Sequence, residues 1–288
     1  MKAIYKRELR AYFNSMTGWV FAAALSVFIG IYFTAYNLMA GYTYFSYALN
    51  ATLIVFMALV PVLTMRSLAE ERRSKTDQLL FTAPVSLTGV VLGKYFAMLT
   101  VLAAPVALAC VCPLIIRMNG TAHFKADYAS LLAYFLLAAA EIALGLLVSS
   151  LTESQVIAAV GTFCLLLALY LWDGLVSLMP TSVSGSLAGL TIALLAVCLL
   201  LNALSGSWKL TAAVLVLGAA ALGGFYLRDS SAFAGLLPDV LGRFSLLDAF
   251  NNFATGHVFD IPGLLLYLSL IALLVFLTVQ VLQKRRWN

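Results

Sequence analysis

The sequence predicts an all-α protein that crosses a membrane many times, and three observations carry this prediction. Apolar residues make up 63% of the 288 residues and charged residues only 10%, whereas soluble domains carry about 45–50% apolar and about 25% charged residues. The apolar residues fall in runs of roughly 20, the length that a helix needs to cross the hydrocarbon core. Lys and Arg are concentrated in the polar segments of one side. A chain of this composition cannot cover itself with a polar surface in water.

Eight runs are long and apolar enough to be spanning helices. They are Gly18–Leu38, Tyr47–Met65, Val90–Ile116, Tyr128–Ser150, Val156–Leu178, Leu187–Leu204, Leu210–Leu227 and Ile261–Leu282. The sixth and seventh runs are short and rich in small residues. We therefore expect about eight transmembrane helices, with a six-span alternative in which the sixth and seventh runs form a hairpin that dips in from outside.

The orientation of the spans follows from the placement of Lys and Arg, which favour cytoplasmic segments. If the N-terminus is cytoplasmic and all eight runs span, thirteen of the 17 Lys and Arg residues lie in the cytoplasm. The remaining four, Arg117, Lys125, Arg228 and Arg243, lie outside. The six-span alternative gives nearly the same split, because a single lysine changes side. We expect both termini in the cytoplasm and residues 228–260 as an extracytoplasmic segment of short helices at the outer leaflet.

Residues 1–16 are expected to form a helix that lies in the headgroup plane, because their apolar and basic side chains occupy neighbouring arcs of a helix. The apolar arc holds Tyr5, Leu9, Tyr12, Phe13 and Met16, and the basic arc holds Lys6, Arg7 and Arg10. Each cation near an anionic leaflet contributes about 1 kcal/mol. The alternative is an ordinary basic tail that obeys the positive-inside rule.

Residues 66–94 form the longest polar interruption on the cytoplasmic side. Asp77 can cap a short helical turn, and Pro84 ends it, because a residue before proline avoids the α region. The turn carries Leu79, Leu80 and Phe81. Apolar side chains exposed on a loop need a partner. They either fold back onto the membrane surface or dock on another subunit.

Motifs for catalysis or cofactor binding are missing from the sequence. The stretch from Gly89 to Lys94 has three residues between its glycines and a tyrosine after the lysine, whereas a phosphate-binding loop has four residues and then Ser or Thr. The four cysteines lie inside apolar runs and lack the spacing of a zinc site. We expect no enzyme activity, no metal and no cofactor. The basic residues follow membrane topology and do not predict nucleic-acid binding.

Glu141 is the one acidic residue near the middle of a predicted span, where it costs roughly 2.5–3.5 kcal/mol on insertion scales. Two roles are open: a buried polar contact between helices, or a step in a proton relay. The absence of a second acid or a histidine at matching depth favours the polar contact.

Four stretches of the chain carry a family resemblance. They read KRELRAYFNSMTGWVF, EERRSKTDQLLFTAPVSLTGVVLGKYFA, LGLLVSSLTESQVIAAVGTF and, at the C-terminus, LTVQVLQKRRW. In these stretches the chain resembles the ABC-2-type permeases, and looks closest to the branch named for gliding-motility and multicopper-enzyme-maturation permeases. Residues 187–227 supply an extra pair of hydrophobic segments relative to the six-span core of that family.

The resemblance implies a single transmembrane domain over residues 1–288 that serves as the permease subunit of an ATP-binding cassette exporter. Two permease chains, either identical or paralogous, would form the pathway, and cytoplasmic ATPase subunits would drive it. The implied setting is the plasma membrane of a bacterium, with membrane lipid around the interfacial helix. The family's loop pattern assigns Thr76, Leu79, Leu80 and Pro84 to the ATPase contact, and the neighbouring Phe81 joins them.

The main alternative function is a secondary transporter or channel that uses an ion gradient. Such a protein is expected to show paired intramembrane charges and inverted repeats with broken helices. The sequence shows one central acid and no obvious repeat. A membrane scaffold or assembly factor without transport activity is a further alternative.

Overall fold

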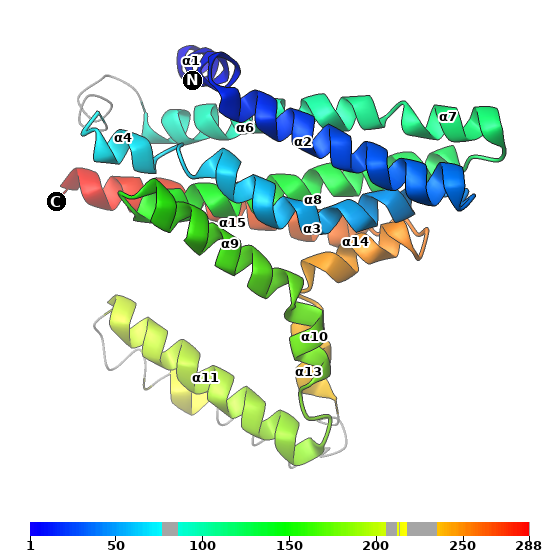
Figure 1. The fold of residues 1–288 in the computed structure, drawn as a ribbon. Helices are drawn as coiled ribbons and strands as arrows, with labels where there is room; N and C mark the ends of the chain where they lie inside the picture. The colour runs from blue at the N-terminus through cyan, green and yellow to red at the C-terminus, as the bar shows by residue number, and fades with distance from the viewer. Residues whose placement is uncertain (77–85, 206–211, 213, 218–234, 288) are drawn as a thin grey trace. The chain divides into compact units, whose positions relative to one another are not determined.

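A computed structural model describes residues 1–76, 86–205, 212, 214–217 and 235–287. In these residues every regular element is a helix (Figure 1). The chain divides into two compact units, of which the first comprises Met1–Tyr170 with Leu246–Asn288 and the second comprises Leu171–Ser245. The extent of a single domain over residues 1–288 stays a prediction.

The first unit is a bundle of long helices with shorter ones at its two ends. Its elements are α1 (Lys2–Asn14), α2 (Met16–Tyr32), the π-helix η1 (Phe33–Met39), α3 (Ser46–Thr64), α4 (Ala69–Arg73), α6 (Leu87–Ala109), α7 (Cys112–Asn119), α8 (Phe124–Leu151), α9 (Gln155–Tyr170), α14 (Leu246–Ala254) and α15 (Ile261–Trp287). In Figure 1, α1 is seen end-on while α2, α3, α8 and α15 are seen from the side, so α1 runs crosswise to the bundle. The change of direction occurs at Ser15, whose backbone is extended.

Five stretches of helix in the described residues are long and apolar enough to cross a membrane. They are Met16–Met39, Ser46–Arg73, Leu87–Asn119, Phe124–Leu151 and Ile261–Arg285. These stretches coincide with the first four predicted runs and with the last. The multi-pass helical fold is therefore confirmed, while the count of eight spans stays a prediction.

The fifth, sixth and seventh predicted runs differ in outcome. Val156–Leu178 is divided, because α9 ends at Tyr170 and a separate short helix, α10 (Trp172–Ser177), follows in the second unit. The sixth run lies within α11 (Val183–Ser205), an apolar helix of 23 residues. Most of the seventh run lies outside the described residues.

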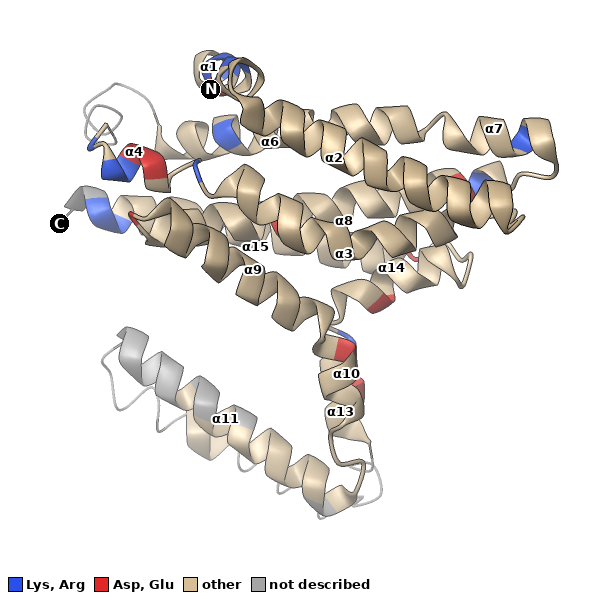
Figure 2. Cartoon of the chain, in the orientation of Figure 1, with Lys and Arg blue, Asp and Glu red and all other residues tan. Residues whose placement is uncertain are grey.

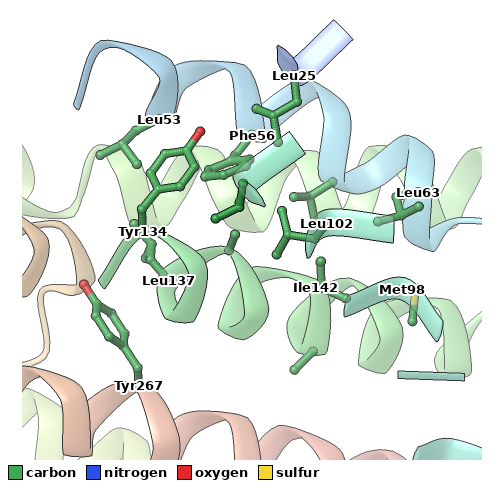
Figure 3. Packing of buried hydrophobic residues seen from close by; sticks show 14 of the residues in the cluster. Leu25, Leu53, Phe56, Leu63, Met98, Leu102, Tyr134, Leu137, Ile142 and Tyr267 are labelled. Atoms are coloured by element: carbon green, nitrogen blue, oxygen red, sulfur yellow. The ribbon is translucent and has the colours of Figure 1, made fainter. Parts of the chain in front are cut away.

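The interior of the first unit is filled with apolar side chains from α2, α3, α6, α8 and α15 (Figure 3). The Phe56 and Tyr134 rings pack with their centroids 4.8 Å apart. Close approach of α3 and α8 depends on Gly145, because a Cβ there would overlap the side chain of Thr64. Small residues of this kind let helix backbones meet in membranes.

Several buried polar side chains in this interior form hydrogen bonds, as a low-dielectric environment favours. The hydroxyls of Tyr134 and Thr52 lie 2.8 Å apart. The hydroxyl of Tyr267 donates to the carbonyl of Leu246 over 2.7 Å, which ties α15 to α14. Asp127, which is fully buried, accepts the backbone N–H of Phe45 over 2.8 Å. These bonds fix the connections between the long helices.

The predicted extracytoplasmic segment 228–260 is divided between the units. Residues 228–234 lie outside the described part of the chain. In the second unit α13 (Leu236–Gly242) packs against α10 and α11, and the indole of Trp172 donates to the carbonyl of Leu241 over 2.9 Å. In the first unit α14 packs against α3, α8 and α15, which buries Phe250 and Phe253 inside the protein. The side of the membrane on which this segment lies stays a prediction.

Candidate functional site

Residues 66–94, the cytoplasmic loop predicted to contact the ATPase, have two stems, and both emerge at the end of the bundle that also carries α1. The first stem is α4 with the turn that follows it up to Thr76, and the second is the start of α6, where the Ser86 hydroxyl caps the helix by accepting the N–H of Gly89 over 3.2 Å. Of the predicted ATPase contacts, Leu79, Leu80, Phe81 and Pro84 lie outside the described residues. Thr76 is described and exposed, and its N–H donates to the carbonyl of Glu71 over 3.0 Å.

Four charged side chains meet where α1, α4 and α6 come together. Lys94 of α6 places its Nζ 3.2 Å from Oε1 of Glu8 and 3.0 Å from Oε1 of Glu71. Arg7 of α1 places its Nη2 2.6 Å from the same Glu8 oxygen and 2.7 Å from the same Glu71 oxygen. Two cations and two carboxylates therefore form a closed, charge-neutral cluster, which we call the Lys94 cluster.

Three members of the Lys94 cluster, Lys94, Glu8 and Glu71, are largely removed from solvent, while the side chain of Arg7 is 54% exposed. Lys94 itself is 1% exposed, and its ammonium also donates to the carbonyl of Ser67 over 2.8 Å. The hydrogen bond to Glu8 raises the pKa of Arg7, so that guanidinium stays charged at any physiological pH. Charge-assisted hydrogen bonds of this kind are about twice as strong as neutral ones. The two neighbouring carboxylates lie where they compensate the charge of the buried lysine side chain.

The backbone of α1 can approach α6 because the residue before Lys94 is a glycine. A Cβ at Gly93 would lie 3.1 Å from Cγ2 of Ile4 and 3.3 Å from the nitrogen of Tyr5. At the other end of α1, the buried Tyr12 hydroxyl donates to the carbonyl of Leu63 over 3.2 Å. Burial raises the pKa of Tyr12, so its phenol remains a neutral donor. The helix is thus fixed to α6 and α3 along its buried face.

The break between α3 and α4 is closed by a serine of α8. The hydroxyl of Ser149 accepts the N–H groups of Leu68 and Ala69 over 3.2 and 3.1 Å and donates to the carbonyl of Met65 over 3.3 Å. It satisfies the first amides of α4 in the manner of a helix cap, although it is distant in sequence. Arg72 adds an ion pair of 2.6 Å with Glu153, in the turn after α8. The first stem of the loop is therefore fixed to α8 as well.

A polar cavity of about 390 Å³ adjoins the Lys94 cluster. Arg7, Glu8, Glu71 and Lys94 line it together with residues of the first stem, including Ser74 and Thr76. The described residues contain no group of three or more His, Cys, Asp or Glu that could hold a metal ion.

The predicted interfacial helix is present as α1, and the structure assigns its residues to two faces. Tyr5, Leu9 and Phe13 are half-buried against the bundle, while Lys6 and Arg10 are exposed on the neighbouring arc of the helix. The Tyr5 hydroxyl lies 2.9 Å from that of Thr100 on α6. Contact of this helix with a membrane surface stays a prediction.

Glu141 lies in α8, within one of the five candidate spans. Its Oε2 is buried and has no hydrogen-bond partner in the part of the chain that the structure describes. The expected polar contact between helices is thus not formed by this oxygen, and the role of the residue stays a prediction.

Most of the residues that build this site were not singled out from the sequence. Glu8, Lys94 and Ser149 carry its central contacts, and Glu8 and Lys94 are 86 positions apart in the chain. One sequence feature points to this site: a glycine followed by a cation, Gly93 and Lys94, near the start of an apolar helix. Nothing local indicates which acids face that lysine.

The helical bundle with its five apolar spans defines a polytopic α-helical membrane protein. Residues 9–182 match a family model described as ABC-2 family transporter protein. The match covers more than half of the chain, and the chain belongs to this family, whose members are transmembrane components of ABC transporters and generally not enzymes. No curated protein matches the sequence.

Proposed function

We propose that this permease works in an ATP-driven exporter, and that a separate cytoplasmic ATPase drives it through residues 66–94 and α1. The observation that carries the proposal is the Lys94 cluster. It joins the interfacial helix, the first stem of the loop and the first turns of α6 in one ionic contact centred on the buried Lys94. A displacement of the loop by a bound ATPase would therefore reach α6 directly.

The distribution of charge supports the orientation that this mechanism needs. Figure 2 shows Lys and Arg on α1, on α4, at the start of α6 and at the C-terminal end of α15, all at one end of the bundle. The opposite end carries Arg117 and Lys125. Under the positive-inside rule the end with α1 and α4 is cytoplasmic. From the family resemblance we assign the chain to a bacterial plasma membrane and, from its loop sequence, to the gliding-motility and multicopper-enzyme-maturation branch.

This orientation can be tested by cysteine labelling in intact cells, in a background that lacks the four native cysteines. Ser74 and Thr121 are both exposed and lie at opposite ends of the first unit. A membrane-impermeant thiol reagent should label Thr121→Cys and should leave Ser74→Cys unlabelled until the cells are permeabilised. The opposite labelling pattern would reverse the orientation.

The ATPase contact is tested by purifying the tagged chain in mild detergent and measuring ATP hydrolysis in the purified complex. The double variant Leu79→Ser, Leu80→Ser should lose the ATPase and the hydrolysis, because truncation of an interface anchor typically costs about 2 kcal/mol or more. Glu70→Gln serves as the matched control on the same loop. Its ion pair with Arg66 is exposed, and exposed pairs contribute about 0–1 kcal/mol.

Two outcomes decide the proposal. If the double Leu variant retains a nucleotide-hydrolysing partner at the wild-type level, residues 79 and 80 do not contribute to the ATPase contact. Failure of the unmodified chain to retain any such partner would overturn the ATP-driven assignment. An ion-coupled transporter would then be the leading hypothesis.

A further inference from the structure

An open apolar groove runs along the outer face of α6, next to the start of α1. Its floor and walls are Phe96, Leu99, Thr100 and Ala103 of α6 together with Phe135 of α8, and its volume is about 660 Å³. The α6 residues recur at spacings of three and four, so they form one stripe of the helix. A volume of this size is typical of ligand sites.

The upper end of the groove is closed by α1. Tyr5 and Lys2 line it there, and the Tyr5 hydroxyl pairs with that of Thr100 at 2.9 Å. The one hydroxyl of the α6 stripe is thereby satisfied by the protein. The rest of the α6 and α8 lining consists of Phe96, Leu99, Ala103 and Phe135, which offer only hydrocarbon.

A row of cations leads to the mouth of the groove. Lys2, Lys6 and Arg10 follow one another at intervals of four along α1, so they share a face of the helix. All three are exposed, and none forms an ion pair with any residue that the structure describes. Arg7, on the same helix, differs from these three residues because it forms ion pairs with Glu8 and Glu71 in the Lys94 cluster.

We infer that the groove is a binding site for an anionic phospholipid. One acyl chain lies along Leu99, Ala103 and Phe135, and the phosphate lies at the ammonium of Lys2. The seven residue steps from Phe96 to Ala103 correspond to roughly 10 Å along the helix axis. That length places the groove in the hydrocarbon region directly below the headgroup plane in which α1 lies.

The charge around the groove selects a lipid in preference to a second copy of this chain. Figure 2 shows that the end of the bundle with α1 and α4 is rich in Lys and Arg, so a second copy meeting this face would bring charge of the same sign. An anionic lipid supplies both parts that the surface lacks, a negative headgroup beside Lys2 and a hydrocarbon chain for the groove. The inference rests on the location of α1 at the membrane surface and does not depend on the ATPase.

The test uses the purified full chain in phosphatidylcholine vesicles that contain a small fraction of photoactivatable phosphatidylglycerol, with the reactive group in the acyl chain. After irradiation, mass spectrometry measures the adducts on the peptide that contains residues 96–103. Lys2→Gln should lower this labelling about fivefold, because Lys2 is the cation that lines the groove and one cation beside an anionic headgroup contributes about 1 kcal/mol. Lys6→Gln is the matched charge control, because Lys6 does not line the groove, and it should change the labelling less than twofold.

A second pair of variants tests the acyl chain. Ala103→Trp fills the groove and should abolish the labelling, whereas Ala104→Trp adds the same bulk at an exposed position outside the groove and should leave it intact. Equal labelling by a phosphatidylcholine probe, or equal effects of the two Trp variants, would overturn the inference. So would a change of oligomer size in Ala103→Trp alone, because a second copy would then cover the groove. ATPase co-purification is a separate measurement and is unaffected by any of these results.

Discussion

Replacement of Lys94 by Met removes a buried cation and keeps the length of the side chain. The ammonium of Lys94 contacts Glu8 at 3.2 Å and Glu71 at 3.0 Å, and its side chain is 2% exposed. After the change, two carboxylates with exposures of 12% and 16% share the guanidinium of Arg7. Removal of one partner from a buried ion pair costs about 3–5 kcal/mol. We expect a loss near 3 kcal/mol in the free energy of unfolding, because Arg7 still compensates part of the negative charge.

Thermal unfolding of the detergent-solubilised protein measures this loss. For a chain of this size 1 kcal/mol shifts the melting temperature by about 2–4 °C, so Lys94→Met should melt about 6–12 °C lower than the wild type. Arg66→Met is the matched control, since its pair with Glu70 has exposures of 40% and 45% and is worth about 0–1 kcal/mol. Adding Glu71→Gln to Lys94→Met should recover part of the loss, because one uncompensated carboxylate is gone. Equal melting of Lys94→Met and Arg66→Met would refute the role given to the Lys94 cluster.

Three further predictions concern helix contacts and pH. Gly145→Ala should destabilise the protein by about 1–3 kcal/mol through overlap with Thr64, whereas Gly30→Ala, where a Cβ meets nothing within 4 Å, should not; thermal melting compares the two. Adding Thr64→Gly should restore the stability of Gly145→Ala, and a failure to do so would locate the strain elsewhere. Burial and the nearby second histidine lower the pKa of His257 below its ordinary value of 6.5, and its ring stacks on Tyr44 with centroids 3.6 Å apart. On acidification the unfolded chain therefore takes up the proton at a higher pH than the folded chain, so stability should fall as pH drops from about 7 through 6.5 to the folded-state pKa. A series of thermal melts against pH measures this fall, and the fall should be smaller in a His257→Gln variant.

The long helices of the first unit could be predicted from hydropathy, because each exceeds the length of a bilayer crossing. The boundary at Leu171 could not, since the run Val156–Leu178 contains no proline and stays apolar across the end of α9. Within the second unit, Trp172 donates a hydrogen bond to the carbonyl of Leu241, a residue 69 positions away in the chain. A hydropathy average does not detect the end of α9, because it reports composition and carries no information on which distant residues each helical turn contacts.

The amphipathic character of residues 1–16 predicted a surface helix but not its contacts. Positive charge alone grouped Arg7 with the exposed Lys6 and Arg10, while the structure separates it from them by pairing it with Glu8 and Glu71. Lys94 was counted among cytoplasmic loop charges, and the structure buries it. Both differences arise from long-range ion pairs, which a single sequence does not encode in any local pattern.

The filled interior of the first unit makes it stiff. Side chains packed at the density of a crystal resist compression and sliding, so α3, α6 and α8 shift together when one of them is pushed. With 28 residues, α8 is about 42 Å long, and a tilt of roughly 5° about one end moves the other by about 4 Å. A small displacement of α1 or α4 would thus produce a larger displacement at the distant end of the bundle, because the long helices act as rigid levers.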